Sequence, residues 1–425
     1  MSRLAVDGGV PIRTAPFPEY RTIGEEEKKA VAEVLDSGIL SAFLGTWSPE
    51  FFGGPRVLKL EEEWSRYFGV AHAVSMNSAT SGLFAALGAA GVGPGDEVIV
   101  SPFTMSASAV GPLIYNAIPV FADIDEESFC LSAQTIRAVL TERTKAIVVV
   151  DLFGHPAPMD EIMALAGERG ITVIEDAAQA PGAKLGNRYA GTLGHIGVFS
   201  LNYHKHIHSG EGAVVVTDDA RLAERLQLIR NHAEVVLQQK GDGDLNNMLG
   251  FNYRMTEIEA AIASEQLKKL EGLLSARLER TAQLTELLSS LRGISTPVTG
   301  PDCVHAFYIY ALRYDSVAVG VPRTRIVEAL RAEGIPISEG YVAPIYLQPL
   351  YQQRKLFGGV GSPWNDPAWR GSVSYARGIC PVTERMHDEV LLYTGAVHAQ
   401  TSYEDVEQMA QAFHKVIGHF QRAGA

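Results

Sequence analysis

An apolar run leads directly into acidic residues in the segment 171–179. Residues 171–174 are followed by Glu175 and Asp176, and Gln179 comes shortly after them. A carboxylate at the end of a buried strand can hold a protonated ring nitrogen, which makes an aromatic cofactor ring an electron sink. An acidic residue in this position more often has a structural role alone, in which it ends a strand or begins a helix. Asp176 is therefore a candidate that needs support from other segments.

A lysine follows another apolar run, at 198–201. Lys205 stands between that run and the turn Gly210-Glu211-Gly212. A lysine amine forms a Schiff base readily when desolvation or nearby positive charge favours its neutral form. A single lysine beside a glycine turn is usually a surface residue, but a carboxylate at the end of a neighbouring strand makes Lys205 more interesting. The hydroxyl of Ser200 is suited to a phosphate.

Residues 75–83 have the pattern of a short strand followed by a helix N-terminus. Free backbone N–H groups at that position, together with serine and threonine hydroxyls around Ser78 and Ala79, form a cradle for a phosphate. Any N-capped helix looks like this, so the segment carries little weight alone. An amine, a carboxylate and an anion cradle are together what pyridoxal phosphate (PLP) chemistry needs.

The elements that must position these groups follow an alternating pattern. Between residues 70 and 220, short apolar runs alternate with helical stretches, and most runs lack a period of two. The runs are 97–100, 118–122, 146–150, 171–174, 198–201 and 213–216. Strands that are buried on both faces by helices have this pattern, which predicts a mostly parallel α/β sheet. Ligands bind at the carboxyl ends of such strands.

The remaining segments predict an α+β unit after the sheet. We expect helices at 25–35 and 255–291, where Gly272 is a point at which the second could break or bend. A strand at 305–314, a helix at 324–331 and a final helix from Ser402 follow. At 425 residues the chain is long enough for two domains. We predict a large domain with an N-terminal arm at 1–270 and a smaller C-terminal domain at 271–425.

Composition excludes several kinds of protein. The net charge of -13 and the lack of a Lys/Arg run argue against nucleic-acid binding, and no apolar run reaches membrane length. Three scattered cysteines without a Cys-x-x-Cys pair, and no secretory signal, predict a cytoplasmic protein. His204, His206 and His208 alternate but lack a distant carboxylate or cysteine partner, so we expect no metal site.

Taken together, the segments resemble the DegT/StrS-type sugar aminotransferases, which have the fold type I PLP architecture. Residues 93–100 are similar to the family's GPGDEVIV strand, and residues 175–180 to its EDAAQA motif. Lys205 with Gly210-Glu211-Gly212 matches K-x4-GEG, and residues 250–257 match G-x-NYRM-x-E. The last three motifs in this order are highly specific, and the parallels cover nearly the whole chain.

The resemblance implies a role for each matching residue at the cofactor. Lys205 would form the Schiff base with PLP and act as the acid and base that moves the proton. Asp176 would pair with the pyridine nitrogen, and Gln179 would lie near the ring oxygen. Ser78, Ala79 and Ser200 would bind the phosphate.

The resemblance also implies a shared site. Asn252 would reach the phosphate of the neighbouring subunit, so the active unit would be a homodimer. The sequence departs from the family at three positions: Met105 stands where an aromatic residue often covers the ring, His204 precedes the lysine, and His195 replaces an aspartate. A methionine can still cover an aromatic face, though less rigidly. These departures bear on the substrate more than on the reaction class.

Three functions stay open at this point. The first is amino transfer from glutamate or glutamine to a nucleotide-linked keto sugar or a keto-cyclitol. The arm 4–13 and the loop 340–346 resemble the inosose-aminotransferase branch, which makes aminocyclitols for antibiotics. The second is a dehydration like that of the aminohydroxybenzoate synthases, and the third is a non-catalytic PLP-fold protein. Tyr341, Tyr346 and Tyr351 are equally suited to line a site or to pack.

Overall fold

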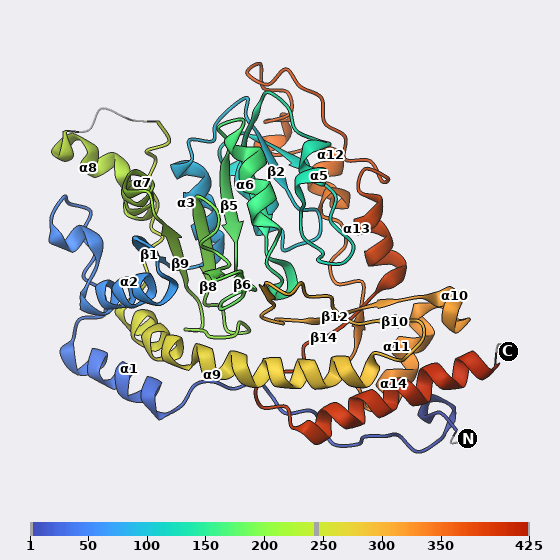
Figure 1. Ribbon diagram of the computed structural model, residues 1–425. Helices are drawn as coiled ribbons and strands as arrows, with labels where there is room; N and C mark the ends of the chain where they lie inside the picture. Colours follow the sequence, from blue (N-terminus) through green and yellow to red (C-terminus); the bar gives the residue numbers. More distant parts are fainter. Residues whose placement is uncertain (1–2, 242–245, 424–425) are drawn as a thin grey trace.

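Seven strands form the central sheet of the protein (Figure 1). The computed structural model describes residues 3–241 and 246–423. The strands run in the order β1-β9-β8-β5-β4-β2-β3. Their bounds are β1 His72–Met76, β9 Ala213–Thr217, β8 Ile196–Ser200, β5 Thr172–Asp176, β4 Thr144–Val150, β2 Glu97–Val100 and β3 Ile118–Phe121.

The sheet is mostly parallel, as its apolar runs predict. Neighbours from β8 to β3 pair in parallel, and only β9 runs antiparallel to its neighbours β1 and β8. Every residue of β2, β8 and β9 is buried. Strands covered on both faces have no polar face to present, which explains why their sequences do not alternate. The predicted fold class is confirmed.

Helices cover both faces of the sheet. One face carries α3 Ala79–Ala89, α4 Ala107–Ile114 and α7 Ala220–Arg230, and the other carries α2 Pro55–Phe68, α6 Met159–Gly167 and the first turns of α9. Gly82 lets α3 approach the sheet closely. A Cβ at Gly82 would lie 2.9 Å from side-chain carbons of both Val198 and Val215. This close approach brings the N-terminus of α3 to the ends of β8 and β9.

A single long helix connects the sheet to the C-terminal part. Helix α9 (Glu257–Leu288) would be about 48 Å long and crosses the molecule beneath the sheet (Figure 1). It begins with a capping box at Thr256 and Glu259 and passes Gly272 without interruption. The prediction that the helix could break at Gly272 is therefore wrong. No heavy atom outside the helix backbone lies within 4 Å of a Cβ built there, so no close contact requires a glycine at this position.

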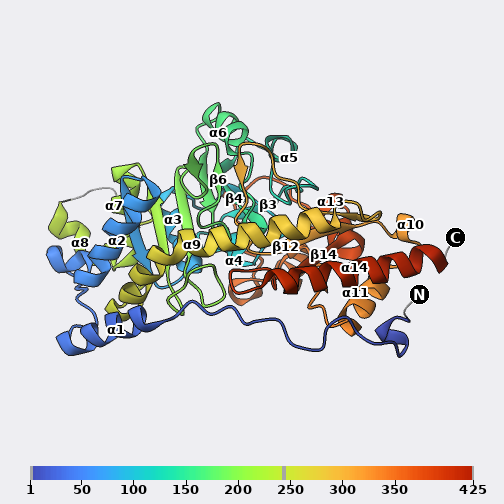
Figure 2. The same cartoon turned by 60° about the horizontal axis from the view of Figure 1, so that its bottom comes forward.

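The C-terminal part has its own sheet, in the order β10-β12-β14-β13. Helix α14 packs beside α9, and α11 packs against α14 (Figure 2). The strand predicted at 305–314 is shorter than expected. Its first residues leave the sheet because Ala306 N donates to Gly154 O in the large part. The bounds of this part are β10 Ile294–Ser295, β12 Tyr310–Tyr314, β13 Ser338–Glu339, β14 Leu391–Thr394, α10 Ser316–Val319, α11 Arg323–Ala332 and α14 Tyr403–Ala423.

Several shorter elements were not predicted from the sequence. A three-stranded sheet forms in the order β11-β6-β7.

The opening helix α1, in contrast, was predicted. It agrees with its predicted range and ends at Gly38. The other bounds are α1 Glu25–Ser37, α5 Ala133–Arg137, α8 Ala233–Lys240, α12 Pro349–Gln353, α13 Pro381–Arg385, β6 Lys184–Leu185, β7 Arg188–Tyr189 and β11 Cys303–Val304.

Two segments cross the boundary predicted near residue 270. Part of the later segment 345–380, with Tyr346 and Tyr351, packs in the core of the large sheet. Conversely, Leu4 of the N-terminal arm is buried in the core of the C-terminal part, and Figure 2 shows the arm running from there to α1. Residue 270 itself lies inside α9. The boundary stays a prediction.

Candidate active site

One cavity of about 250 Å³ opens at the carboxyl ends of β4, β5 and β8. All of the predicted cofactor-binding residues except Asn252 line it. They are Ser78, Ala79, Met105, Asp176, Gln179, Ser200 and Lys205. Parallel strands collect the residues that follow them at one edge of the sheet, so groups far apart in sequence meet there.

Asp176 is the last residue of β5 and only 5% exposed. Its Oδ2 accepts a hydrogen bond of 2.8 Å from Ser108 Oγ, and its Oδ1 accepts one from Ala178 N. Burial raises the pKa of Asp176, while these two donors and the charge of Lys205 lower it. The donors hold the carboxylate in place and favour its ionised form.

Lys205 is 8% exposed, and its amine makes no hydrogen bond or ion pair with the described residues. The ammonium lies 4.5 Å from the centre of the Tyr308 ring. Burial lowers the pKa of Lys205 to about 8, and the charge of Asp176 opposes this shift only in part. A buried amine that is not tied into an ion pair is ready to lose its proton, as a nucleophilic lysine must.

The loop that carries Lys205 is fixed at both ends. Leu201 N donates to Gly212 O, and Ser209 N donates to Leu201 O. Gly212 has φ of +137°, and a Cβ there would lie 2.8 Å from Met255 Cε. From the N-terminal arm, the Tyr20 hydroxyl donates to His206 O at 2.6 Å. The glycines of the Gly-Glu-Gly turn are needed for this closed loop.

The N-terminus of α3 forms the opposite wall of the cavity. Ser78 is the N-cap, and its Oγ accepts from Ser81 N at 3.1 Å. The N–H groups of the first turn have no partner within the helix, so they can bind an anion. Ser200 Oγ lies on the facing strand end and accepts from Asn202 N. This wall is suited to a phosphate.

Gln179 is held by a strained segment. Phe153 N donates to Gln179 Oε1 at 2.7 Å, and Gln179 Nε2 donates to Tyr341 OH at 3.0 Å. Phe153 has a φ of 59°, a conformation that costs energy for a residue with a side chain. A Cβ at Gly154 would lie 2.9 Å from the Gln179 carbonyl oxygen. The segment fixes the amide orientation, leaving Nε2 a second N–H.

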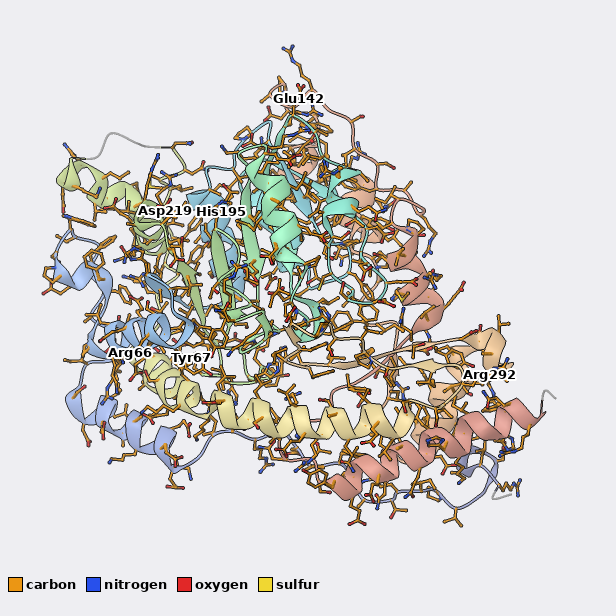
Figure 3. The ribbon with its side chains drawn as sticks, in the orientation of Figure 1. Arg66, Tyr67, Glu142, His195, Asp219 and Arg292 are labelled. Atoms are coloured by element: carbon orange, nitrogen blue, oxygen red, sulfur yellow. The ribbon has the colours of Figure 1, made fainter. Side chains whose placement is uncertain are left out.

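Two of the three departures from the family line the cavity, and the third lies elsewhere. Met105 lines the cavity and is 64% exposed. His204 also lines it, near the ring of Tyr308, and burial lowers its pKa. His195 lies at the opposite end of the sheet, near Asp219 (Figure 3), where its Nδ1 accepts from Val173 N. The replacement at His195 therefore does not touch the cavity.

Asn252 does not line the cavity of its own chain. Its backbone oxygen accepts from Asn77 Nδ2 at 3.4 Å, beside the anion-binding wall, and its Oδ1 accepts from Arg254 Nε at 2.8 Å. Its Nδ2 group donates no hydrogen bond within residues 3–241 and 246–423. The side chain thus keeps a free donor at the rim of the site.

Sequence reasoning missed three residues of the site. Ser108 holds Asp176 from within an apolar helix, and no motif points to it. Tyr308 lies in the segment predicted as a strand, and it reaches the cavity only because residues 305–309 cross to the large part. Asn202 lies on the lysine loop and lines the cavity. Among the three late tyrosines, Tyr341 lines the cavity, while Tyr346 and Tyr351 are buried in the core.

The donors of this cavity match the functional groups of PLP. A helix N-terminus suits its phosphate, a buried amine suits its aldehyde carbon, and a buried carboxylate suits its protonated ring nitrogen. The fold and the cavity define a class, the fold type I PLP-dependent enzymes.

Comparisons with known proteins agree with this class. Residues 21–359 match the DegT/DnrJ/EryC1/StrS aminotransferase family. The L-glutamine:2-deoxy-scyllo-inosose aminotransferase of Streptoalloteichus tenebrarius is 34% identical over 432 residues, covering 98% of each chain. The chain belongs to this family and is a PLP-dependent aminotransferase. Amino transfer is thereby favoured over the other two functions.

Solved structures place the fold in the same group. An aminotransferase from Psychrobacter cryohalolentis superposes with a TM-score of 0.81 at 28% identity, covering 95% of this chain and 100% of the other. DesI, solved in the presence of its TDP-sugar product, gives a TM-score of 0.79 at 27% identity, covering 99% and 97%. In the described part of the chain, no helix is long and apolar enough to cross a membrane.

Proposed function

We propose that this chain binds PLP in the cavity around Lys205. The N-terminus of α3, with Ser78, Ala79 and Ser200, would hold the phosphate. Asp176 would hold the ring nitrogen, and Gln179 would donate its free N–H to the ring oxygen. When bound, PLP supplies an electron sink for the carbanion formed at the amino-bearing carbon.

The chain's own residues would supply the positioning and the proton transfer. Lys205 would attach the cofactor through its amine and would then move a proton as a general acid and base. Its lowered pKa keeps both protonation states within reach near neutral pH. Asp176, fixed by Ser108, would keep the ring nitrogen protonated. Met105 would cover the open face of the ring.

We propose glutamine or glutamate as the amino donor and a keto-cyclitol as the acceptor. The relative from Streptoalloteichus tenebrarius is named for glutamine and an inosose, and it aligns with this chain nearly end to end. The observation that carries the choice is the lining of the cavity. Its charged residues are Asp176, Lys205 and Glu211, and no arginine lines it within the described chain. A neutral polyol can be bound by hydrogen bonds alone, whereas a nucleotide diphosphate is bound most strongly where an arginine or lysine contacts its phosphates.

A substrate screen tests this choice. Purified holoenzyme would be given glutamine or glutamate with either an inosose or a nucleotide-linked keto sugar, and the amino product would be measured. We expect turnover with the inosose. Turnover with the nucleotide sugar alone would assign the enzyme to the other acceptor class.

We also propose a homodimer in which Asn252 reaches the partner's site. Support comes from its free amide group and from two exposed large apolar side chains, Met105 in the cavity lining and Tyr203 on the loop that carries Lys205. Asn252→Ala should weaken retention of PLP. Mixing that variant with Lys205→Ala should restore partial activity, because some heterodimers regain one complete site. A fully active monomer, or mixed dimers without rescue, would show that the sites are not shared.

The cytoplasm is the compartment we propose for this enzyme. Cys130, Cys303 and Cys380 are all free thiols. Free cysteines are typical of proteins in reducing compartments. Fractionation of the producing cells would check the location.

A further inference from the structure

Two buried carboxyl groups lie behind Asp176. Side chains alternate along a strand, so Glu175 faces the side of the sheet opposite to Asp176. Asp151, directly after β4, lies on that same side, and both side chains are completely buried, with 0% exposure. No ion pair joins either of them to a lysine or arginine among the residues that the structure describes. Two charges without a counterion in such a place would be very costly.

Each of the two carboxyl groups has one oxygen that accepts backbone hydrogen bonds and one oxygen that accepts none. Glu175 Oε2 accepts from Leu193 N at 2.9 Å and from Gly194 N at 3.0 Å, and Asp151 Oδ1 accepts from Ala157 N at 2.9 Å. The other oxygen of each group, Glu175 Oε1 and Asp151 Oδ2, is buried without any such donor. Strand register brings the two side chains together, because Glu175 pairs with Val149 on β4, and Asp151 follows Val149 by two residues on the same side of the sheet. Two carboxyl groups can bond to each other only if one carries a proton.

We propose that Asp151 and Glu175 share one proton, which Asp151 Oδ2 donates to Glu175 Oε1. Glu175 is the better site for the charge because it accepts more backbone N–H groups. Burial raises the pKa of both groups, and the N–H groups of residues 193 and 194 offset part of this rise at Glu175. Asp151 therefore stays neutral at the pH of the cell.

The neutral state of Asp151 matters for the catalytic face. The titratable groups close enough to Asp151 to interact with it electrostatically are Glu175, Cys130 and Cys303 on its own side of the sheet and Asp176 on the other side. A charge on Asp151 would raise the pKa of Asp176 and, through the same field, that of Lys205. Asp151 is thus a positioning residue. Because it is neutral, it does not raise the pKa of Asp176, which stays the carboxylate beside Lys205. The proton assignment stands independently of the proposed function, whereas this consequence rests on it.

The pH dependence of unfolding tests the assignment. Asp151→Asn keeps a neutral donor for Glu175 but carries no titrating proton. In the unfolded chain Asp151 is ionised above about pH 4. Unfolding of the wild type must then release one proton that the variant lacks. The ratio of the two unfolding constants, wild type over variant, should rise about tenfold per pH unit between about pH 5.5 and 7.5. A ratio independent of pH would show that Asp151 is ionised in the native protein.

Two further measurements keep the test decisive. The first needs no variant: in holoenzyme labelled with ¹³C at the aspartate carboxyl carbon, the infrared spectrum at neutral pH should contain an isotope-shifted band of a protonated acid. Absence of that band would overturn the assignment.

The second measures the titration of Lys205 by amine labelling without PLP. Asp151→Asn should leave its midpoint unchanged because no charge is removed, while the matched control Asp176→Asn should lower it. A lower midpoint in Asp151→Asn would mean that the wild-type residue is charged. If the unfolding and infrared results hold while the holoenzyme has no transaminase activity, the proposed function fails and the shared proton stands.

Discussion

Arg230 and Lys205 are both buried cations near the central sheet, but their surroundings differ. Arg230, at the end of α7, is 0% exposed, and its guanidinium donates to Glu61 Oε1 at 2.6 Å and to backbone oxygens of Phe52 and Ser75. Lys205 is 8% exposed, and its amine makes no such bond in the described chain. The chain therefore matches one buried charge with a counterion and leaves the other free to titrate.

We infer from this difference that Arg230 is a structural cation and that Lys205 is a reactive one. A buried ion pair fixes the elements around it, because removing one partner leaves an uncompensated charge. The amine of Lys205 lies near Asp176 but does not bond to it directly. The carboxylate is close enough for its charge to raise the pKa of Lys205. Changes at the two positions should consequently affect different properties.

Lys205→Ala should have the largest effect. We expect activity to fall by about 10³-fold or more, because both the attachment of the cofactor and the proton transfer are lost. The melting temperature should stay close to that of the wild type, since the lost side chain leaves no unpaired partner. Activity assays and thermal unfolding of the variant check both points. A normal absorbance spectrum of bound cofactor in this variant would refute the assignment.

Arg230→Ala should show the opposite behaviour. Breaking a buried ion pair leaves Glu61 as an uncompensated charge, and we expect a loss of stability of about 3–5 kcal/mol. Chemical denaturation measures it. The protein that remains folded should still carry the cofactor at Lys205, and a selective loss of attachment with full stability would contradict the comparison.

Asp176→Asn should lower activity by at least about tenfold, or about 1.4 kcal/mol in the barrier. A neutral amide cannot hold the ring nitrogen in its protonated state, although the cofactor should stay bound. Steady-state kinetics with saturating cofactor measures the change. A smaller loss would mean that another acid serves the ring nitrogen.

A further, variant-free prediction concerns pH. Without cofactor, the amine of Lys205 should react with an acylating reagent with a midpoint near pH 8. The native pKa is lower than the unfolded value of about 10.4, so the unfolded chain binds more protons between these values. This group's contribution to stability should therefore be present above about pH 10.4 and be lost as pH falls towards 8. A midpoint above 10 would show that Lys205 is an ordinary lysine.

The sequence predicts the site's reactive residues better than it predicts their supports. Lys205, Asp176 and Gln179 follow apolar runs, and parallel strands bring such residues together whatever the details of packing. Ser108 and Tyr308 have no comparable signal, because their positions depend on where α4 packs and on the return of 305–309 to the large part. Domain limits are harder still, since the segment 345–380 packs across the predicted boundary.

The central claim is that Lys205 is the residue that holds the cofactor. Borohydride reduction of the holoenzyme fixes the cofactor on the amine to which it is attached, and peptide mass mapping then identifies that residue. We expect the added mass on the peptide containing Lys205 and on no other lysine. An added mass on a different lysine, or none on Lys205 in an active enzyme, would contradict it.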